Sequence, residues 1–205
     1  MIKKIVLATH NAHKLEEVRA ILTPLGIEVI GGDEAGLKEI AETGTTFEEN
    51  SRLKACAAYE QLKLPVLADD SGLCITALNG RPGLYSARFA AEHGGFPAVF
   101  DTVWKELKPF SDWSAYFICT MVLKTGPHVD DEHLFMGKML GHIAPRASGT
   151  HLFGYDPIFI PDGYTDTCGV LEPEIKNQIS HRARALAKLV EFLKNRSTFP
   201  VSEGE

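Results

Sequence analysis

Short apolar runs alternate along the chain with segments whose apolar residues recur every three or four positions. The runs at 4–8, 27–30 and 64–68 are typical of buried β-strands. The spacing over 15–25 and 100–107 is typical of helices that pack one face on a core. We therefore expect a chain that mixes short strands with amphipathic helices.

Local signals predict where several helices begin and end. Gly26 should end the first helix, since glycine readily adopts the backbone conformation that follows a helix. Thr46 followed by Glu49 matches a capping box and predicts a helix to about Leu62. Ser180 is a favourable N-cap for the final helix.

Long β-rich runs occupy the second half of the chain. They cover 115–123 and 132–138, continue over 139–143 beyond Gly137, and are separated by the turn residues 125–127. This pattern predicts a separate antiparallel layer.

Length and composition restrict the class of protein. The 205 residues suffice for one domain, which we place at 1–196, and the tail 197–205 is expected to be disordered. A net charge of −6 argues against non-specific nucleic-acid binding, and no apolar run reaches the length that spans a membrane. Four scattered cysteines favour reduced thiols in a cytoplasmic protein.

The stretch 64–73 combines a buried strand with two consecutive acids, Asp69 and Asp70, followed by Ser71 and a glycine. Unpaired carboxylates at the end of a buried strand are costly to desolvate, and a divalent metal would offset that cost. Neighbouring strand residues point to opposite faces, so the two acids are expected to have different roles. A plain Asp-Ser-Gly turn is the alternative.

A strand-to-helix turn occupies Thr9-His10-Asn11-Ala12-His13-Lys14. Free N–H groups and the positive end of the helix dipole favour an anion there, and Lys14 adds a full charge. The turn lacks the glycines of a P-loop. A simple Asn11 cap with a surface lysine is the alternative.

Lys54 lies four residues after Asn50, so both occupy one stripe of the helix that Thr46 begins. A lysine among core-facing residues suggests ligand contact. The alternative is a side chain whose stem is buried and whose amine reaches water.

Two later segments have the composition of a nucleobase pocket. The loop Phe153-Gly154-Tyr155-Asp156-Pro157 joins aromatic rings to a glycine ahead of a short strand at 158–160, and such rings suit stacking on a flat base. Lys176 precedes the final helix, and His181, Arg182 and Arg184 lie in its first turn, where cations oppose the dipole. A tight structural loop and a surface helix are the alternatives.

Taken together, two lysines, a helix N-terminus and a pair of carboxylates suit a polyphosphate with Mg²⁺, which prefers one or two carboxylates plus phosphate oxygens and water. The chain also resembles the inosine triphosphate pyrophosphatases, house-cleaning enzymes that hydrolyse non-standard purine nucleoside triphosphates. The matching motifs, in chain order, are Thr9-x-Asn11-x-x-Lys14, Glu42-Thr43-Gly44 with Phe47-x-Glu49-Asn50-x-x-x-Lys54, Ala68-Asp69-Asp70-Ser71-Gly72-Leu73, Pro82-Gly83-x-Tyr85-Ser86-Ala87-Arg88, Phe153-Gly154-Tyr155-Asp156-Pro157 and Lys176-Asn177-x-Ile179-Ser180-His181-Arg182.

The resemblance implies an elongated two-lobed α/β fold, with a twisted mixed sheet flanked by helices, a smaller antiparallel lobe and a cleft between the lobes. It also implies a homodimer and cleavage of ITP, dITP or XTP between the α and β phosphates. The residues 9–14 would bind the triphosphate with help from Lys54, and Ser71 would touch substrate. Glu42 and Asp70 would hold Mg²⁺, and Asp70 would activate the attacking water with support from Asp69. The base pocket would consist of Phe153, Gly154, Tyr155, Asp156, Lys176, His181 and Arg182.

The chain departs from the family's pattern in three places. Val170 stands where an acid is usual, His10 replaces a common glycine, and the segment between Arg88 and Trp104 is short. Two other functions stay open: a pyrophosphatase for pyrimidine or modified nucleoside triphosphates, and a nucleotide-binding module without turnover.

Overall fold

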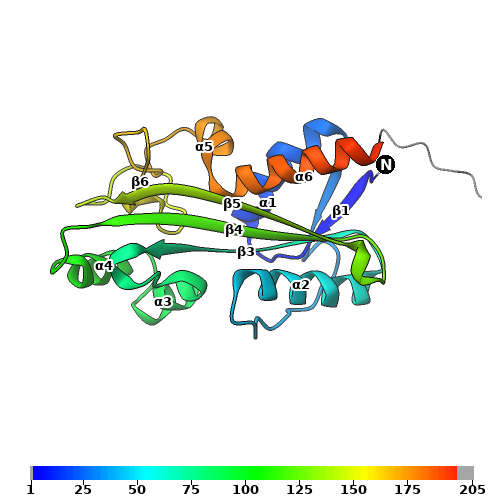
Figure 1. The fold of residues 1–205 in the computed structure, drawn as a ribbon, viewed down its shortest axis with the longest axis horizontal. Helices are drawn as coiled ribbons and strands as arrows, with labels where there is room; N and C mark the ends of the chain where they lie inside the picture. The colour runs from blue at the N-terminus through cyan, green and yellow to red at the C-terminus, as the bar shows by residue number, and fades with distance from the viewer. Residues whose placement is uncertain (1, 198–205) are drawn as a thin grey trace, which may run out of the picture.

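One mixed β-sheet organises the chain in the computed structural model, which describes residues 2–197 (Figure 1). Within that range six strands lie in the order β2-β1-β3-β4-β5-β6. Their bounds are Lys4–Leu7 (β1), Glu28–Gly31 (β2), Val66–Ile75 (β3), Ser114–Lys124 (β4), Glu132–Ile143 (β5) and Phe159–Pro161 (β6). The mixed α/β class expected from the sequence is confirmed.

The antiparallel strands are not a separate layer, and that part of the prediction is wrong. β1 pairs in parallel with both β2 and β3, and β3 then pairs antiparallel with β4 in the same sheet. Gly137 does not divide β5, which runs unbroken from Glu132 to Ile143 against β4. The sheet therefore changes from parallel to antiparallel at β3.

β3 also corrects the expected position of the two acids. Asp69 and Asp70 lie in the middle of a ten-residue strand, paired with Met121 and Thr120 of β4, and not at a strand end. The turn that ends the strand comes only after Ile75, so the carboxylates are held by ladder hydrogen bonds on a rigid element.

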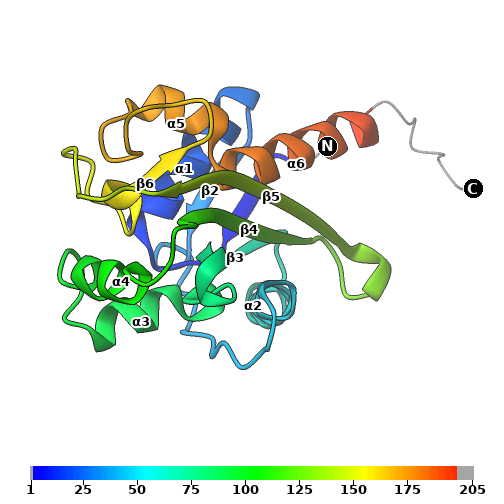
Figure 2. The ribbon, with the colours of Figure 1, turned by 60° about the vertical axis from the view of Figure 1, so that its left-hand side comes forward.

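Helices cover both faces of the sheet (Figures 1 and 2). α1 (Ala12–Leu22), α5 (Pro173–Ile179) and α6 (His181–Ser197) lie on one side, and α2 (Phe47–Leu62) packs on β3 and β4 from the other. α3 (Ser86–Glu92) and α4 (Val99–Leu107) lie toward the far end of the long strands. Residues 198–205 of the tail predicted to be disordered lie outside the described residues, and Ser197 still belongs to α6.

The predicted helix boundaries are confirmed. The Thr46 hydroxyl accepts the Glu49 N–H at 3.1 Å at the start of α2. Gly26 ends the turn after α1 with a φ of 77°, and the Ser180 hydroxyl accepts the Ala183 N–H at 3.0 Å at the start of α6. No pattern in the sequence indicated α5, the short helix that carries Lys176.

Apolar side chains from both strands and helices fill the space beneath α1 and α6. This core contains Ile5, Leu7, Val18, Leu22, Leu67, Met121, Leu123, Leu186 and Leu189, all essentially inaccessible to solvent. Burial of this size stabilises a sheet by about 1.5–3 kcal/mol for each large side chain. It fixes the middle of β3 against α1 and α6, where Asp69 is also directed.

Close approach of α6 to β5 leads to a test of this packing. A Cβ at Gly137 would lie 2.0 Å from the His181 carbonyl oxygen and 2.6 Å from the Ala185 nitrogen. We expect Gly137→Ala to lower the free energy of unfolding by roughly 1–3 kcal/mol or more, because backbone must move. Denaturant unfolding measures this, with His142→Ala, an exposed position on the same strand, as the control. Equal stability of the two variants would contradict the packing.

Candidate active site

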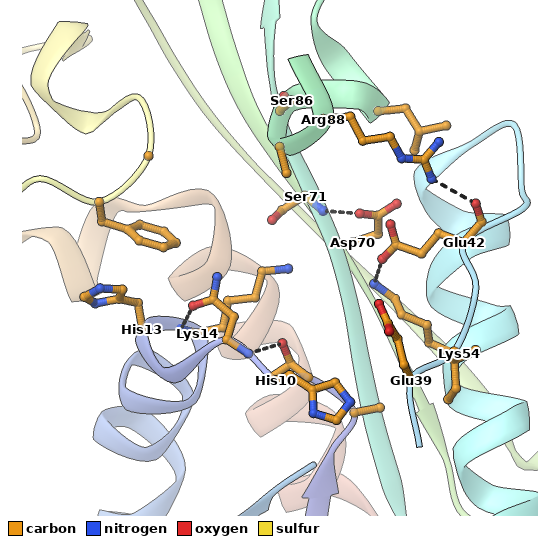
Figure 3. Close-up of a pocket in the computed structure, with 18 of the residues that line it drawn as sticks. His10, His13, Lys14, Glu39, Glu42, Lys54, Asp70, Ser71, Ser86 and Arg88 are labelled. Atoms are coloured by element: carbon orange, nitrogen blue, oxygen red, sulfur yellow. Dashed lines mark hydrogen bonds and ion pairs between the residues drawn. The ribbon is translucent and has the colours of Figure 1, made fainter. Parts of the chain in front are cut away.

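A cavity of about 870 Å³ opens beside the middle of β3 (Figure 3). The N-terminus of α1 lies on one side of it and α2 with the loop before it on the other. Most of the predicted site residues line this cavity: Thr9, His10, Asn11, His13, Lys14, Glu42, Lys54, Asp70, Ser71, Phe153, Gly154 and Tyr155. The other predicted residues, Ala12, Asp69, Asp156, Lys176, His181 and Arg182, are not part of its wall.

The turn at the start of α1 has the geometry of a capped helix that faces the cavity. The side-chain oxygen of Asn11 accepts the Lys14 N–H at 3.3 Å, and the Thr9 hydroxyl accepts the Asn11 N–H at 3.2 Å. Asn11 is therefore the N-cap, as the simpler alternative for this turn predicted, and it also lines the cavity. His10 lies at the rim, with Nδ1 2.6 Å from the Asp33 carboxylate.

Asp69 points toward α1 and α6 and is almost completely buried. Its carboxylate lies 3.1 Å from Lys14 Nζ and 3.0 Å from Arg182 Nη2. Burial by itself would raise the pKa of Asp69, but the charges of Lys14 and Arg182 lower it well below its usual range. Asp69 is thus a fixed negative charge that holds two cations behind the cavity.

Asp70 points to the opposite face, as strand alternation predicts, and reaches the cavity. Asn50 donates to its Oδ2 at 2.9 Å, and the Ser71 N–H donates to its Oδ1 at 2.9 Å. Burial raises the pKa of Asp70, and the neighbouring charge of Glu42 raises it further, against the lowering effect of Lys54. A carboxylate with a raised pKa is a better proton acceptor than an ordinary one.

Lys54 joins both sides of this carboxylate site. Its Nζ donates to Glu42 Oε1 at 2.5 Å and to the Asp69 carbonyl oxygen at 2.6 Å. Burial would lower the pKa of Lys54, but the charges of Asp69 and Asp70 raise it above its usual value. The amine is therefore held charged by buried partners, contrary to the alternative in which only the stem is buried and the amine reaches water.

Glu42 and Asp70 fit a magnesium ion only if the substrate completes its shell. Within residues 2–197 no three acidic, histidine or cysteine side chains gather closely enough to hold a metal alone. Mg²⁺ in nucleotide enzymes is bound by one or two carboxylates together with phosphate oxygens and water. Burial is the main cause of the raised pKa of Asp70, and the charge of Glu42 adds to it. A divalent cation held by these two residues would offset that charge.

Aromatic rings form the other end of the cavity. The centroids of the His13 and Phe153 rings lie 5.0 Å apart. Lys176 Nζ lies 5.0 Å from the centroid of the Phe153 ring, and the Lys176 side chain is only 12% exposed. Tyr155 is buried, and its hydroxyl donates to the Ser86 carbonyl at 3.0 Å, so it anchors the loop. Lys176 in turn pairs with Asp156.

Comparison with known proteins identifies the family of this chain. Residues 5–192 match the sequence profile of the Ham1 family. The chain belongs to the Ham1 family. A relative from Oceanobacillus iheyensis, a dITP/XTP pyrophosphatase, is 45% identical over 195 residues, which cover 93% of this chain and 98% of the relative. A dITP/XTP pyrophosphatase from Aquifex aeolicus is 42% identical over 94% of this chain and 97% of its own.

Solved structures of Ham1 proteins have the same fold. The Ham1 protein from Staphylococcus aureus superposes with a TM-score of 0.83 at 38% identity, covering 95% of this chain and all of its own. A Ham1 protein from Coxiella burnetii gives 0.84 at 39% identity with the same coverage. Among the described residues, no helix is both long and apolar enough to cross a membrane.

Two residues of the predicted base pocket of this Ham1 protein are held away from the cavity. His181 is buried and stacks on Phe117 with ring centroids 4.9 Å apart, and burial lowers the pKa of its imidazole well below the usual value. Arg182 is fully buried and donates to Asp69 and to the Ser71 hydroxyl, each at 3.0 Å. Their assignment to the base pocket therefore stays a prediction from the resemblance.

Sequence reasoning missed several wall residues of the site. The loop before α2 supplies Leu37, Lys38, Glu39, Ile40 and Ala41, and the far wall includes Leu84, Arg88, Phe96 and Leu152. Arg88 also donates to the Glu42 carbonyl oxygen at 3.1 Å, which ties α3 to the loop that carries Glu42. Its motif Tyr85-Ser86-Ala87-Arg88 was noted in the sequence, but no pattern indicated which cavity it faces.

Loss of charge at the two acids of β3 should destabilise the fold to very different extents. We expect Asp69→Asn to lower the free energy of unfolding by roughly 3–5 kcal/mol, because it leaves Arg182 and Lys14 without their buried counter-charge. Asp70→Asn should cost no more than about 1 kcal/mol, because the folded state already disfavours the charged form of that side chain. Denaturant unfolding of both variants measures the difference. An equal loss would show that the two carboxylates share one environment.

Proposed function

We propose that this protein hydrolyses non-standard purine nucleoside triphosphates (ITP, dITP and XTP) to the nucleoside monophosphate and pyrophosphate with Mg²⁺. The observation that carries the proposal is Asp70, a carboxylate with a raised pKa that faces the cavity between Lys54 and the N-terminus of α1. The class of enzyme, a nucleoside triphosphate pyrophosphatase, is supported by the Ham1 family and by relatives that are dITP/XTP pyrophosphatases.

The residues around the cavity divide the reaction between them. The turn 9–14 and Lys14 would hold the triphosphate against the positive end of α1. Asp70 would accept a proton from the water that attacks the α-phosphorus, while the bond from that phosphorus to the bridging oxygen breaks and pyrophosphate leaves. Lys54, fixed by Glu42 and the Asp69 carbonyl, would lie against the charge that develops on the phosphates.

Bound at Glu42 and Asp70, Mg²⁺ would supply charge neutralisation on the phosphate oxygens. The rest of the catalytic arrangement belongs to the protein. Because Asn50 holds Asp70 and Arg88 holds the Glu42 backbone, the two carboxylates are positioned by separate elements, α2 and α3.

Base discrimination would arise at the aromatic end of the cavity. Phe153 offers a face on which a purine can stack, and Lys176 behind it adds positive charge. Donors directed at the six-position oxygen of hypoxanthine or xanthine would meet an amino group in adenine, and an unpaired buried donor discriminates strongly.

A homodimer in the cytoplasm, where the nucleotide pool lies, completes the proposal, and light scattering after size-exclusion chromatography would test the dimer.

A substrate panel tests the reaction and the base preference together. We expect pyrophosphate release from ITP, dITP and XTP with Mg²⁺, little from ATP and GTP, and none with EDTA. Release mainly from dTTP or UTP would keep the chemistry and discard the purine assignment. Tight binding of a triphosphate without release would show a binding module.

Asp70→Asn tests the general base. We expect kcat for ITP to fall by about 10²–10⁴-fold, because an amide cannot accept the proton. Thermal melting should show an intact fold, and Asp101→Asn, an exposed acid on α4 outside the cavity wall, serves as the control. Wild-type turnover by Asp70→Asn would mean that another group activates the water.

A further inference from the structure

A row of alternating charges begins at Lys14 in the cavity wall and continues through residues that do not line the cavity. Consecutive members are joined by ion pairs, and we call the row the charge chain: Lys14, Asp69, Arg182, Glu17, Lys176 and Asp156. Three cations alternate with three carboxylates, so the set is neutral. Its members come from five segments: α1, β3, α6, α5 and the turn before β6.

Glu17 is the central link of the charge chain. Its Oε2 accepts from Arg182 Nη1, and its Oε1 lies 3.0 Å from Lys176 Nζ. Lys14 lies three residues earlier on α1, so both side chains project from one face of that helix. No motif in the sequence singled out Glu17, and it does not line the cavity.

Each charge in the row depends on its neighbours because water hardly reaches it. Side chains of Glu17 and Lys176 are exposed to only 15% and 12%, and those of Arg182 and Asp69 to 1% each. Burial would raise the pKa of Glu17, but the charges of Arg182 and Lys176 lower it to about 2. Glu17 is therefore ionised at neutral pH, and removing it leaves two buried cations short of a partner.

Two cations of the charge chain lie near different parts of the cavity wall. Lys14 lines the cavity at the turn where the phosphates would bind, and Lys176 lies 5.0 Å from the Phe153 ring at the aromatic end. We propose that Glu17 is a positioning residue that couples the phosphate end of the site to the base end by holding Arg182 and Lys176 in one ionic chain. The inference rests on the proposed function, which decides what occupies the two ends.

The coupling follows from how few partners each member has. A shift of Lys176 on binding a base changes its hold on Glu17, and Glu17 also holds Arg182. Arg182 shares the Asp69 carboxylate with Lys14. A change at Lys176 therefore reaches Lys14 through Glu17, Arg182 and Asp69, without any contact between the two lysines.

A double-mutant cycle tests the coupling directly. The Kd of an α,β-methylene analogue of ITP is measured with Mg²⁺ by calorimetry for Lys14→Gln, Lys176→Gln and the double variant. If the two sites are independent, the fold-increase in Kd of the double variant equals the product of the two single increases to within about twofold. We expect the double variant to fall short of that product by about fivefold or more, because the second change acts on a chain that is already broken.

The same cycle on a Glu17→Gln background identifies the link. On that background the two increases in Kd should multiply to within about twofold. On a Glu16→Gln background the double variant should still fall short of the product. Glu16 is the matched control, since it lies on the same helix, is largely exposed and is outside the charge chain. Thermal melting shows whether Lys176→Gln folds. If it does not, Lys176→Arg replaces it, and the cycle measured without a change at Glu17 decides whether the two ends are coupled.

The outcomes separate this inference from the proposed function. Losses that multiply in wild-type protein, or a shortfall that survives Glu17→Gln, would overturn the coupling. Hydrolysis of ITP by the wild-type enzyme together with either result would leave the proposed function standing. Absence of ITP hydrolysis and of analogue binding by the wild-type protein would overturn both.

Discussion

The ion pair between Asp69 and Arg182 is the interaction on which the rest of the site depends. Both side chains are about 1% exposed, so neither charge can be left without the other. The pair joins the middle of β3 to the first turn of α6, two segments 113 residues apart in the chain. It therefore ties the parallel end of the sheet to the C-terminal helix, and the same Asp69 carboxylate also holds Lys14.

Strand alternation then gives the adjacent acid the opposite environment. Asp69 is surrounded by cations, which lower its pKa. The pKa of Asp70, one residue later, is raised by burial and by the charge of Glu42. One strand thus holds one carboxylate among cations and the next where burial raises its pKa. A strand is better suited to this than a loop, because its ladder of hydrogen bonds to β4 keeps both side chains in fixed directions.

Much of this arrangement is predictable from local sequence. The caps at Thr46 and Ser180, the turn at 9–14 and the opposite directions of the Asp69 and Asp70 side chains follow from short-range geometry, and each is confirmed. The separate antiparallel layer and the strand end at Asp70 are wrong, because a continuous strand and a strand followed by a turn look alike when Asp, Ser and Gly interrupt the apolar run. Local patterns also missed α5, a helix of only seven residues.

What the sequence by itself determined is the set of chemical groups: two lysines, two acids and an aromatic loop, in an order that resembles one family. Only the tertiary structure decided which of them meet. Glu17 becomes the partner of Arg182 across 165 residues, and Arg182 faces Asp69 and not the open cavity. The physical reason is that a buried charge is defined by the charges around it, and packing α1, α5 and α6 on one sheet brings those charges together from segments that no local pattern connects.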